Sequence, residues 1–219
     1  MREAAEWGLC RREARKVERR TAIVEIARRR FLEHGYDRTS MSAIVEEMGG
    51  SKGTLWSYFA SKEQLFAAAI DAMTTALRSS IVAILDPSRD PHEVLTILAE
   101  QLIDRITLPD AIALQRLIVG EVDRFPEIGR IFYDSGPGAG QAVLTDYIAA
   151  LVHNGNLSGC VPEEAAQMFF NLCAGGYHQH VLWGVAAHDS HRARREAALV
   201  VQHFLRCYGA PSQGTEPRG

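Results

Sequence analysis

The stretch Thr39–Leu65 reads TSMSAIVEEMGGSKGTLWSYFASKEQL, and it decides the fold of the chain. Ser40 is placed to cap a short helix, and Gly49–Gly50 ends that helix because glycine adopts the left-handed backbone conformation at little cost. Ser51 is placed to cap a second short helix. An S-x-x-Q capping box beginning at Ser61 starts a third, longer helix. The stretch therefore predicts two short helices around a tight turn, followed by a long helix.

The second short helix has the side chains expected of a DNA reader. Leu55 and Phe59, four residues apart, predict one buried stripe. The other side carries a basic group, hydroxyl groups and flat rings without an acid, namely Lys52, Thr54, Trp56, Ser57 and Tyr58. Lysine and hydroxyl groups meet phosphate oxygens, and Thr54 and the rings reach base edges. This pattern predicts a helix-turn-helix DNA-binding unit, and the alternative is an ordinary amphipathic helix pair.

A wider set of positions recurs at a fixed spacing around this pair: Phe31, Gly35, Tyr36, Thr39, Ser40, Met41, Ile44, Gly49, Ser51, Lys52, Gly53, Thr54, Leu55, Tyr58, Phe59, Ser61, Lys62, Glu63 and Leu65. Over about residues 21–66 the chain thereby resembles the N-terminal domain of TetR-family transcriptional repressors. Three positions depart from the family pattern. Val45 replaces a small alanine, Gly50 replaces an apolar residue, and Trp56 replaces a tyrosine that commonly contacts phosphate. Trp56 keeps an N–H donor but cannot accept a hydrogen bond.

The resemblance and the reader chemistry together imply a dimer on a pseudo-palindromic operator, with one half-site for each subunit. The expected DNA-binding residues are Ser40, Ser51, Lys52, Gly53, Thr54, Trp56, Ser57, Tyr58 and Lys62. Among them, Ser40 and Lys62 are expected to anchor phosphates. A small molecule bound in the rest of the chain is expected to move the helix of residues 63–85 and to weaken DNA binding.

Charge is distributed unevenly along the 219 residues. Residues 1–65 contain 13 lysines and arginines against 10 acids, a net charge of +3, whereas residues 66–219 contain 11 against 17, a net charge of −6. This asymmetry supports a basic N-terminal part that approaches phosphate and an acidic remainder that does not.

The four cysteines, Cys10, Cys160, Cys173 and Cys207, are widely spaced and form no C-x-x-C motif. Residues 1–20 lack the apolar core of a secretory signal, and no run reaches the roughly 18–20 apolar residues that span a bilayer. We therefore expect a cytoplasmic protein without a membrane partner and with reduced thiols. Inert buried cysteines are the favoured interpretation, and a redox-sensing cysteine is the alternative.

Helical periodicity continues to the end of the chain, without a convincing strand or an internal repeat. Beyond the stretch that decides the fold, the patterns predict helices over residues 21–34, 63–85, 91–107, 110–123, 141–153, 162–184 and 191–208. In these predictions Asp90 and Asp110 cap their helices, and residues 136–140, GPGAG, form a break. The predicted fold is all-α.

Four segments follow from these patterns. Residues 1–20 form a charged extension, residues 21–66 the DNA-binding domain, residues 67–208 a helical ligand-binding and dimerisation domain, and residues 209–219 a disordered tail. The extension is interpreted either as a frayed start of the first helix or as a basic arm that follows DNA, because Glu13 and Glu18 dilute its positive charge.

The segment Arg116–Gly138, RLIVGEVDRFPEIGRIFYDSGPG, resembles the C-terminal domain of the AefR-like branch of the TetR family. The last two predicted helices are more apolar than a single core needs. They are expected to form a four-helix interface between two copies, as the resemblance also implies.

Nothing in the sequence indicates catalysis or a cofactor. Hydrolase, P-loop, dinucleotide and metalloprotease motifs are missing, and the late histidines have poor spacing for a metal, since His178 and His180 point about 200° apart on a helix. A ligand pocket is expected between the body helices, where the polar candidates are Glu121, Tyr147, His153, Asn171, Tyr177 and Trp183.

The sequence thus predicts a homodimeric transcriptional regulator, most simply a repressor that a small molecule releases from DNA. Two alternatives belong to other classes. One is a helical enzyme or metal protein that uses the late histidines. The other is a dimeric ligand-binding protein whose DNA-reading head is impaired at Gly50 and Trp56.

Overall fold

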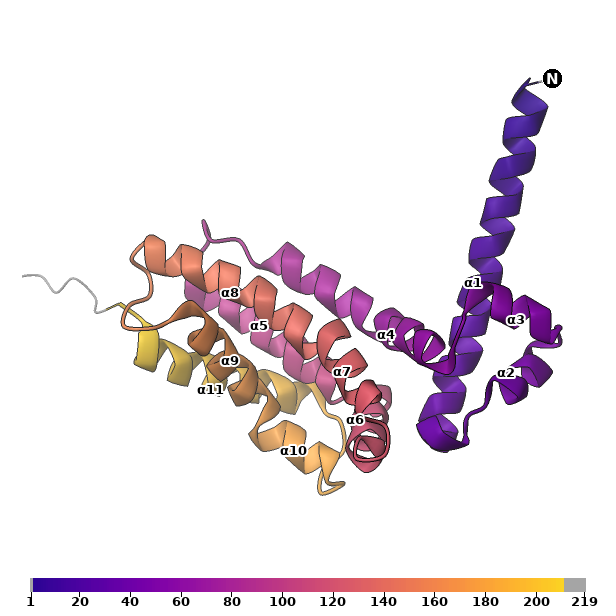
Figure 1. The fold of residues 1–219 in the computed structure, drawn as a ribbon. Coiled ribbons are helices and arrows are strands. Elements are labelled where there is room, and N and C mark those ends of the chain that lie inside the picture. Colours follow the sequence, from indigo (N-terminus) through magenta and orange to yellow (C-terminus); the bar gives the residue numbers. More distant parts are fainter. Residues whose placement is uncertain (1, 211–219) are drawn as a thin grey trace, which may run out of the picture. The chain divides into compact units, whose positions relative to one another are not determined.

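The computed structural model describes residues 2–210, and within them the chain is all-α, as predicted (Figure 1). The only extended pairing in this range is an isolated antiparallel bridge between Leu157 and Gly209. The helices are α1 (Arg2–Arg38), α2 (Met41–Met48), α3 (Lys52–Tyr58), α4 (Lys62–Ile84), α5 (Pro91–Ile106), α6 (Pro109–Glu121), α7 (Pro126–Ser135), α8 (Pro137–His153), α9 (Pro162–Ala174), α10 (Gly176–Leu182) and α11 (Ser190–Tyr208).

The chain divides into two compact units. The first, called the head unit below, comprises Met1–Thr74 and Leu117–Ser135, and the second, called the body unit, comprises Thr75–Arg116 and Gly136–Gly219. Helices α4 and α6 each contribute residues to both units. The segment Leu117–Ser135, which the sequence analysis assigned to the ligand-binding domain, therefore packs with the head.

The short helices of the head unit begin and end at the residues that the sequence indicated. The Ser40 hydroxyl accepts a hydrogen bond from the Ala43 N–H at 3.1 Å, and Gly49 ends α2 with a φ of 61°. The Ser51 hydroxyl accepts from the Thr54 N–H at 3.1 Å at the start of α3. These are local caps for the first orphan N–H groups of each helix.

The capping box that starts α4 differs in one detail from the prediction. The Ser61 hydroxyl accepts from the Gln64 N–H at 3.2 Å, as the motif requires. The Gln64 side chain, however, accepts at 3.0 Å from the N–H of Ala60, one residue before the cap.

Aromatic rings hold the core of the head unit together. The Phe31 and Phe66 rings meet edge to face with their centroids 4.9 Å apart, and the Tyr36 ring meets Phe66 at 5.1 Å. Ile23 and Leu55 are fully buried in the same unit. Arg29 and Arg30 of α1 both pair with Glu47 of α2, which ties the first helix to the helix-turn-helix.

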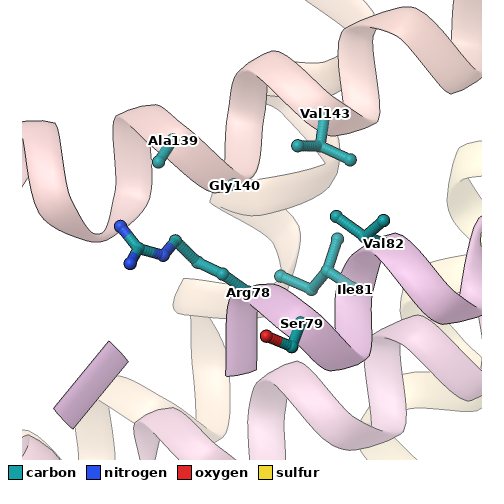
Figure 2. Close-up of a pocket in the computed structure, with 7 residues that line it drawn as sticks. All are labelled: Arg78, Ser79, Ile81, Val82, Ala139, Gly140 and Val143. Carbon is teal, nitrogen blue, oxygen red and sulfur yellow. The ribbon is translucent and has the colours of Figure 1, made fainter. Parts of the chain in front are cut away.

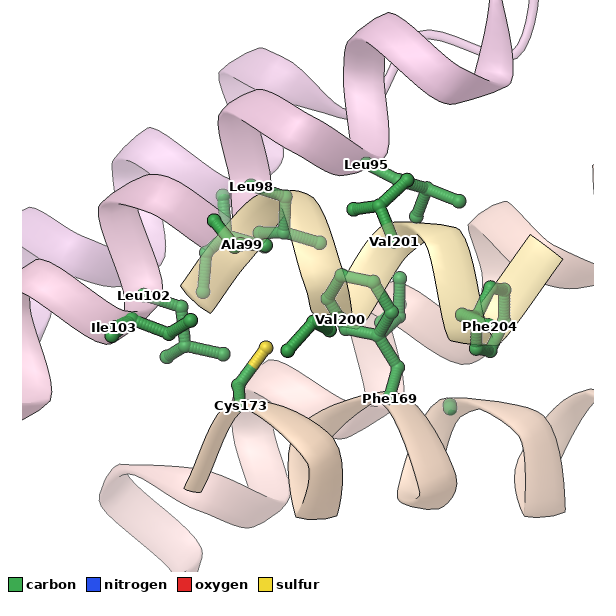
Figure 3. Packing of buried hydrophobic residues seen from close by; sticks show 14 of the residues in the cluster. Leu95, Leu98, Ala99, Leu102, Ile103, Phe169, Cys173, Val200, Val201 and Phe204 are labelled. Carbon is green, nitrogen blue, oxygen red and sulfur yellow. The ribbon is translucent and has the colours of Figure 1, made fainter. Parts of the chain in front are cut away.

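The core of the body unit is aliphatic and aromatic (Figure 3). Helix α11 packs on α5 and α9, and α8 packs on α9. Phe169 and Phe204 meet edge to face, with centroids 5.2 Å apart, between these helices. Geometry of this kind is favourable beyond the burial of area alone.

Four helix boundaries differ from the predictions. Helix α1 begins at Arg2 instead of Thr21, although Gly35 interrupts it with a φ of 84° where its end was expected. Helix α6 begins at Pro109, so that Asp110 lies in its first turn and is not its cap. Helix α8 begins at Pro137, which confines the predicted break at 136–140 to Gly136.

The fourth difference is the division of the predicted helix 162–184 into α9 and α10. The break lies at Gly175, where the backbone is extended, and at Gly176, where φ is 45°. This backbone path is one that glycine adopts without steric cost. The predicted tail, residues 209–219, lies outside the described residues except for Gly209 and Ala210, which contact the 156–158 loop through backbone hydrogen bonds and the bridge.

Candidate DNA-binding site

Helix α3 presents most of the predicted reading residues to solvent. Lys52, Gly53 and Ser57 are exposed, and Trp56 is 50% accessible. Leu55 and Phe59 are buried beneath them, as the four-residue spacing predicted. The helix therefore carries basic, hydroxyl and aromatic groups on the side that faces away from the head core.

Several hydroxyl groups of this site also hold the backbone in place. The Thr54 hydroxyl lies 3.0 Å from the Ser51 hydroxyl, and the Ser57 hydroxyl donates to the Thr54 carbonyl at 2.7 Å. Thr54 and Tyr58 are partly buried. Lys52 and Trp56 are thus the long exposed side chains of α3 with a donor at their tips.

Lys62 is directed toward the interior side of the head. Its ammonium donates to the Asp37 carbonyl at 3.3 Å and lies 4.1 Å from the centroid of the Tyr36 ring. Burial lowers the pKa of this ammonium, and the nearby carboxylates, Asp37 foremost, oppose that shift. The phosphate contact predicted for Lys62 stays a prediction, and the ammonium has further N–H donors beside the one that Asp37 accepts.

Two arginines that the sequence analysis did not select contact the helix-turn-helix from α1. The Arg19 guanidinium donates to the Met48 carbonyl at 3.4 Å, and the Arg20 guanidinium lies 5.1 Å from the centroid of the Phe59 ring. A Cβ at Gly50 would lie 2.5 Å from the Met48 methyl group and 3.0 Å from an Arg19 nitrogen. Gly50 has no side chain to occupy the space beside the turn. The side chains of Met48 and Arg19 fill that space.

Glu121, a predicted ligand residue, instead belongs to the head unit. Its carboxylate accepts from the Tyr36 N–H at 2.9 Å and from the Asp37 N–H at 2.7 Å. Arg124 pairs with Asp37 at 3.0 Å beside this contact. The carboxylate caps backbone donors directly after Gly35, so the structure gives Glu121 a structural partner in the head.

The structure does not gather the other five ligand candidates around one space. His153, Asn171 and Trp183 are exposed, and Trp183 is 66% accessible. Tyr177 is buried, with its hydroxyl donating to the Ala187 carbonyl at 3.0 Å and accepting from the Asp189 N–H. Tyr147 is also buried, and its hydroxyl has no hydrogen-bond partner.

A pocket of about 410 Å³ lies elsewhere in the body unit, between α4 and α8 (Figure 2). It is lined by Arg78, Ser79, Ile81, Val82, Ala139, Gly140 and Val143. The lining is mostly apolar, and the Arg78 side chain extends along it toward α8. The polar ligand candidates did not predict this pocket, because its lining is mostly apolar and includes the small residues Ala139 and Gly140.

Neither the cysteines nor the histidines of the described part form a reactive cluster. Burial raises the pKa of the Cys173 thiol, which makes its reactive thiolate rare. Burial lowers the pKa of His178, whose Nδ1 lies 2.9 Å from the Ala174 carbonyl. Among the residues that the structure describes, no group of three or more histidine, cysteine, aspartate or glutamate side chains is arranged to hold a metal ion.

Helix α4 is the one described helix that is long and apolar enough to cross a membrane by length and composition. The head core takes Leu65 and Phe66 from this helix, and the body core takes Ile81 and Ile84. Helices from the core of a soluble protein can meet the same criterion of length and composition.

Comparisons with known proteins agree with this architecture. The family model for bacterial regulatory proteins of the tetR family matches residues 23–69, and the model for the C-terminal domain of AefR-like transcriptional repressors matches residues 93–210. A solved TetR-family transcriptional regulator from Mesorhizobium loti MAFF303099 is 27% identical, with a TM-score of 0.77 over 90% of this chain and 99% of that chain. The flavonoid-responsive regulator FrrA is 30% identical, with a TM-score of 0.76 over 92% of this chain and 99% of that chain.

Curated relatives match over shorter regions. The transcriptional repressor AcnR of Corynebacterium diphtheriae is 44% identical over 50 residues, which are 23% of this chain and 26% of AcnR. The chain spans between about a quarter and two-fifths of the length of such curated relatives.

Proposed function

The chain belongs to the TetR family of transcriptional regulators, and on that premise we propose that it is a homodimeric repressor that a small molecule releases from its operator. The observation that carries the proposal is the exposed side of α3, where Lys52 and Trp56 stand on a helix capped by Ser51. A capped helix N-terminus also attracts phosphate through its free N–H groups. In this proposal α3 enters the major groove of one half-site, and the protein works in the cytoplasm.

The dimer is proposed to form through α9 and α11. Both helices bury one face in the body core, and each also exposes large apolar side chains. Met168 on α9 is 45% accessible and Leu199 on α11 is 50% accessible. Pairing these helices with those of a second copy would cover these side chains in a four-helix interface.

The inducer is proposed to enter the pocket between α4 and α8. Its volume lies within the roughly 300–1,000 Å³ typical of small-molecule sites, and its lining suits an apolar molecule. FrrA is described as flavonoid-responsive, so flat phenolic compounds are the first class to test. Because α4 contributes to both units, a ligand that displaces Arg78–Val82 can act on the head through the same helix.

DNA binding is tested by fluorescence anisotropy on DNA from upstream of the gene, with scrambled duplex as competitor. We expect binding that survives competitor, and we expect the double variant Lys52→Ala/Tyr58→Ala to lose it while remaining a dimer. Specific binding that survives in this variant would show that α3 is not the recognition helix. A wild-type dimer that binds ligand but discriminates no DNA sequence, even in a selection from random genomic fragments, would favour the impaired-head alternative.

Induction is tested by adding phenolic compounds to the protein–DNA complex. Val82→Trp fills the pocket from an exposed position and should abolish release, whereas Val119→Trp, on the exposed side of α6, should preserve it. Since coupling between two ligands is reciprocal, operator DNA should weaken inducer affinity by the factor by which inducer weakens DNA affinity. Equal release from wild type and Val82→Trp would place the inducer elsewhere.

A further inference from the structure

The first part of α1 carries a basic stripe that the helix-turn-helix does not include. Arg12, Arg15, Lys16 and Arg19 follow the spacing i, i+3, i+4, i+7, which places them on one face of a helix. All four side chains are exposed. At about 100° per residue, Glu13 and Glu18 fall roughly 100° or more to either side of Arg12. Glu13 and Glu18 therefore border the basic stripe, each roughly 60° from one of its outer residues, and the four cations lie together on the face between them.

This basic stripe continues the face by which α1 packs into the head. Ile23 and Ala27 lie eleven residues, about three turns, after Arg12 and Lys16, so each pair shares a face of α1. Both Ile23 and Ala27 are fully buried in the head unit. The stripe thus lies on the side of α1 that packs into the head, one to three turns before Ile23.

Arg19 connects the stripe to the reading site. Its guanidinium donates to the Met48 carbonyl at the end of α2, beside Gly50. The Arg19 nitrogen lies close to Gly50, 3.0 Å from where a Cβ would stand. One end of the basic stripe therefore sits at the turn that leads into α3, and the other end projects past the helix pair.

From this placement we propose that the basic stripe binds the phosphate backbone of duplex DNA that flanks the half-site read by α3. The proposal rests on the proposed function for the position of the DNA. The seven steps from Arg12 to Arg19 extend over roughly 10 Å of helix, which matches about three base pairs along the duplex. Arginine and lysine on such a face contact phosphates without reading bases, so the basic stripe adds affinity and not sequence preference.

The test removes two charges from the stripe and compares salt dependence. The variant Arg12→Gln/Lys16→Gln is measured beside Arg105→Gln/Arg130→Gln, which removes the same charge from exposed positions on α5 and α7. If both stripe residues contact phosphates, the slope of log Kobs against log[salt] becomes less negative by about 1.8 for each protomer. From about 50 mM to about 200 mM salt, each wild-type protomer then loses about tenfold more affinity than a variant protomer.

DNA length supplies a second measurement. Wild-type protein should bind an operator with long flanks more tightly than the same operator trimmed to the half-sites, and this preference should be smaller in the stripe variant, which keeps Arg15 and Arg19. The control variant should retain both the wild-type slope and the preference for long flanks. An unchanged slope in the stripe variant, or a flank preference as large as that of the wild type, would overturn the proposal.

Failure of the stripe and failure of the proposed function are distinguishable. The salt slope is also measured on duplex DNA of random sequence, where recognition by α3 plays no part. Wild-type protein that discriminates no DNA sequence, but has a steeper slope on random duplex than Arg12→Gln/Lys16→Gln, would contradict the proposed function and leave the stripe contact intact. A wild-type slope equal to that of Arg12→Gln/Lys16→Gln on random duplex would refute the stripe contact even where the operator is recognised.

Discussion

Gly35 and Glu121 form a close pair within the head unit. Gly35 has a φ of 84°, and a Cβ at this position would lie 2.3 Å from a Glu121 carboxylate oxygen. The carboxylate uses the approach that the missing side chain allows to accept the Tyr36 and Asp37 N–H groups. The single glycine thus serves two needs, because the left-handed backbone and the close carboxylate both exclude a side chain.

Replacement of Glu121 should therefore destabilise the head. Glu121→Gln keeps the shape, but its amide can offer only one oxygen to two backbone donors, and the charge is lost. We expect the free energy of unfolding to fall by about 2 kcal/mol, as for charge-assisted hydrogen bonds, in urea denaturation. Asp123→Asn, at a nearby exposed position, is the control and should change it little. Equal effects of the two substitutions would contradict the capping role.

The buried Tyr147 hydroxyl without a partner predicts an alkaline instability. Burial raises the pKa of Tyr147 to about 12, whereas an unfolded tyrosine titrates near 10. Between these values the unfolded state loses a proton that the folded state retains, so stability falls as pH rises from about 10 toward 12. Tyr147→Phe should be neutral or stabilising by about 1 kcal/mol at pH 7 and should reduce the alkaline loss. A substantially destabilised Phe variant at neutral pH would show that the hydroxyl has a partner.

At the scale of single elements, α3 depends on one capping side chain. Ser51 accepts the Thr54 N–H at the start of a helix of only seven residues, which has little intrinsic stability. Ser51→Ala should cost about 1 kcal/mol in thermal or urea unfolding of the head and should weaken operator binding. Ser42→Ala, at an exposed position within α2, removes a serine that is not a cap and should leave both properties near wild type. Wild-type stability and operator binding in the Ser51→Ala variant would mean that packing alone holds α3.

Helix boundaries were predictable to different degrees for a physical reason. The starts of α2, α3 and α5 depend on Ser40, Ser51 and Asp90, each of which binds an N–H two or three residues ahead. The glycines were harder to interpret, because the same residue type ends one helix and lies inside another. Gly140 is buried within α8, and a Cβ at this position would lie 3.1 Å from the Phe170 ring. The glycine therefore allows close packing there.

For the whole molecule, two neighbouring residues of α9 should affect different properties. One should affect the stability of the core, and the other should affect dimer formation. Phe169 is fully buried against Phe204, whereas Met168 is 45% accessible. Phe169→Ala should lower the unfolding free energy of the body by about 3–5 kcal/mol. Met168→Ala should leave that stability near wild type and should shift the dimer toward monomer in analytical ultracentrifugation. Unchanged association of the Met168 variant would argue against α9 as an interface helix.

The site was predicted in part. The reading helix, its caps and its buried residues Leu55 and Phe59 follow from local spacing, and the structure agrees on their placement. The inward position of Lys62 and the approach of Arg19 were not predictable, because each depends on a backbone carbonyl supplied by another segment. None of the six ligand candidates lines the pocket between α4 and α8. Polarity within an apolar helix identifies an unusual residue but not the direction in which it points.

The sequence by itself determined the all-α class, the helix-turn-helix and most of its caps, since these depend on groups within a few residues of one another. Only the tertiary structure decided that the Glu121 carboxylate accepts a hydrogen bond from the Tyr36 N–H near the end of α1. The two residues are 85 positions apart in the sequence. It also decided where the pocket lies and how Arg19 meets the turn. Such contacts form between helices that pack as whole units, and a long-range approach of this kind leaves no periodic signal in either partner's local sequence.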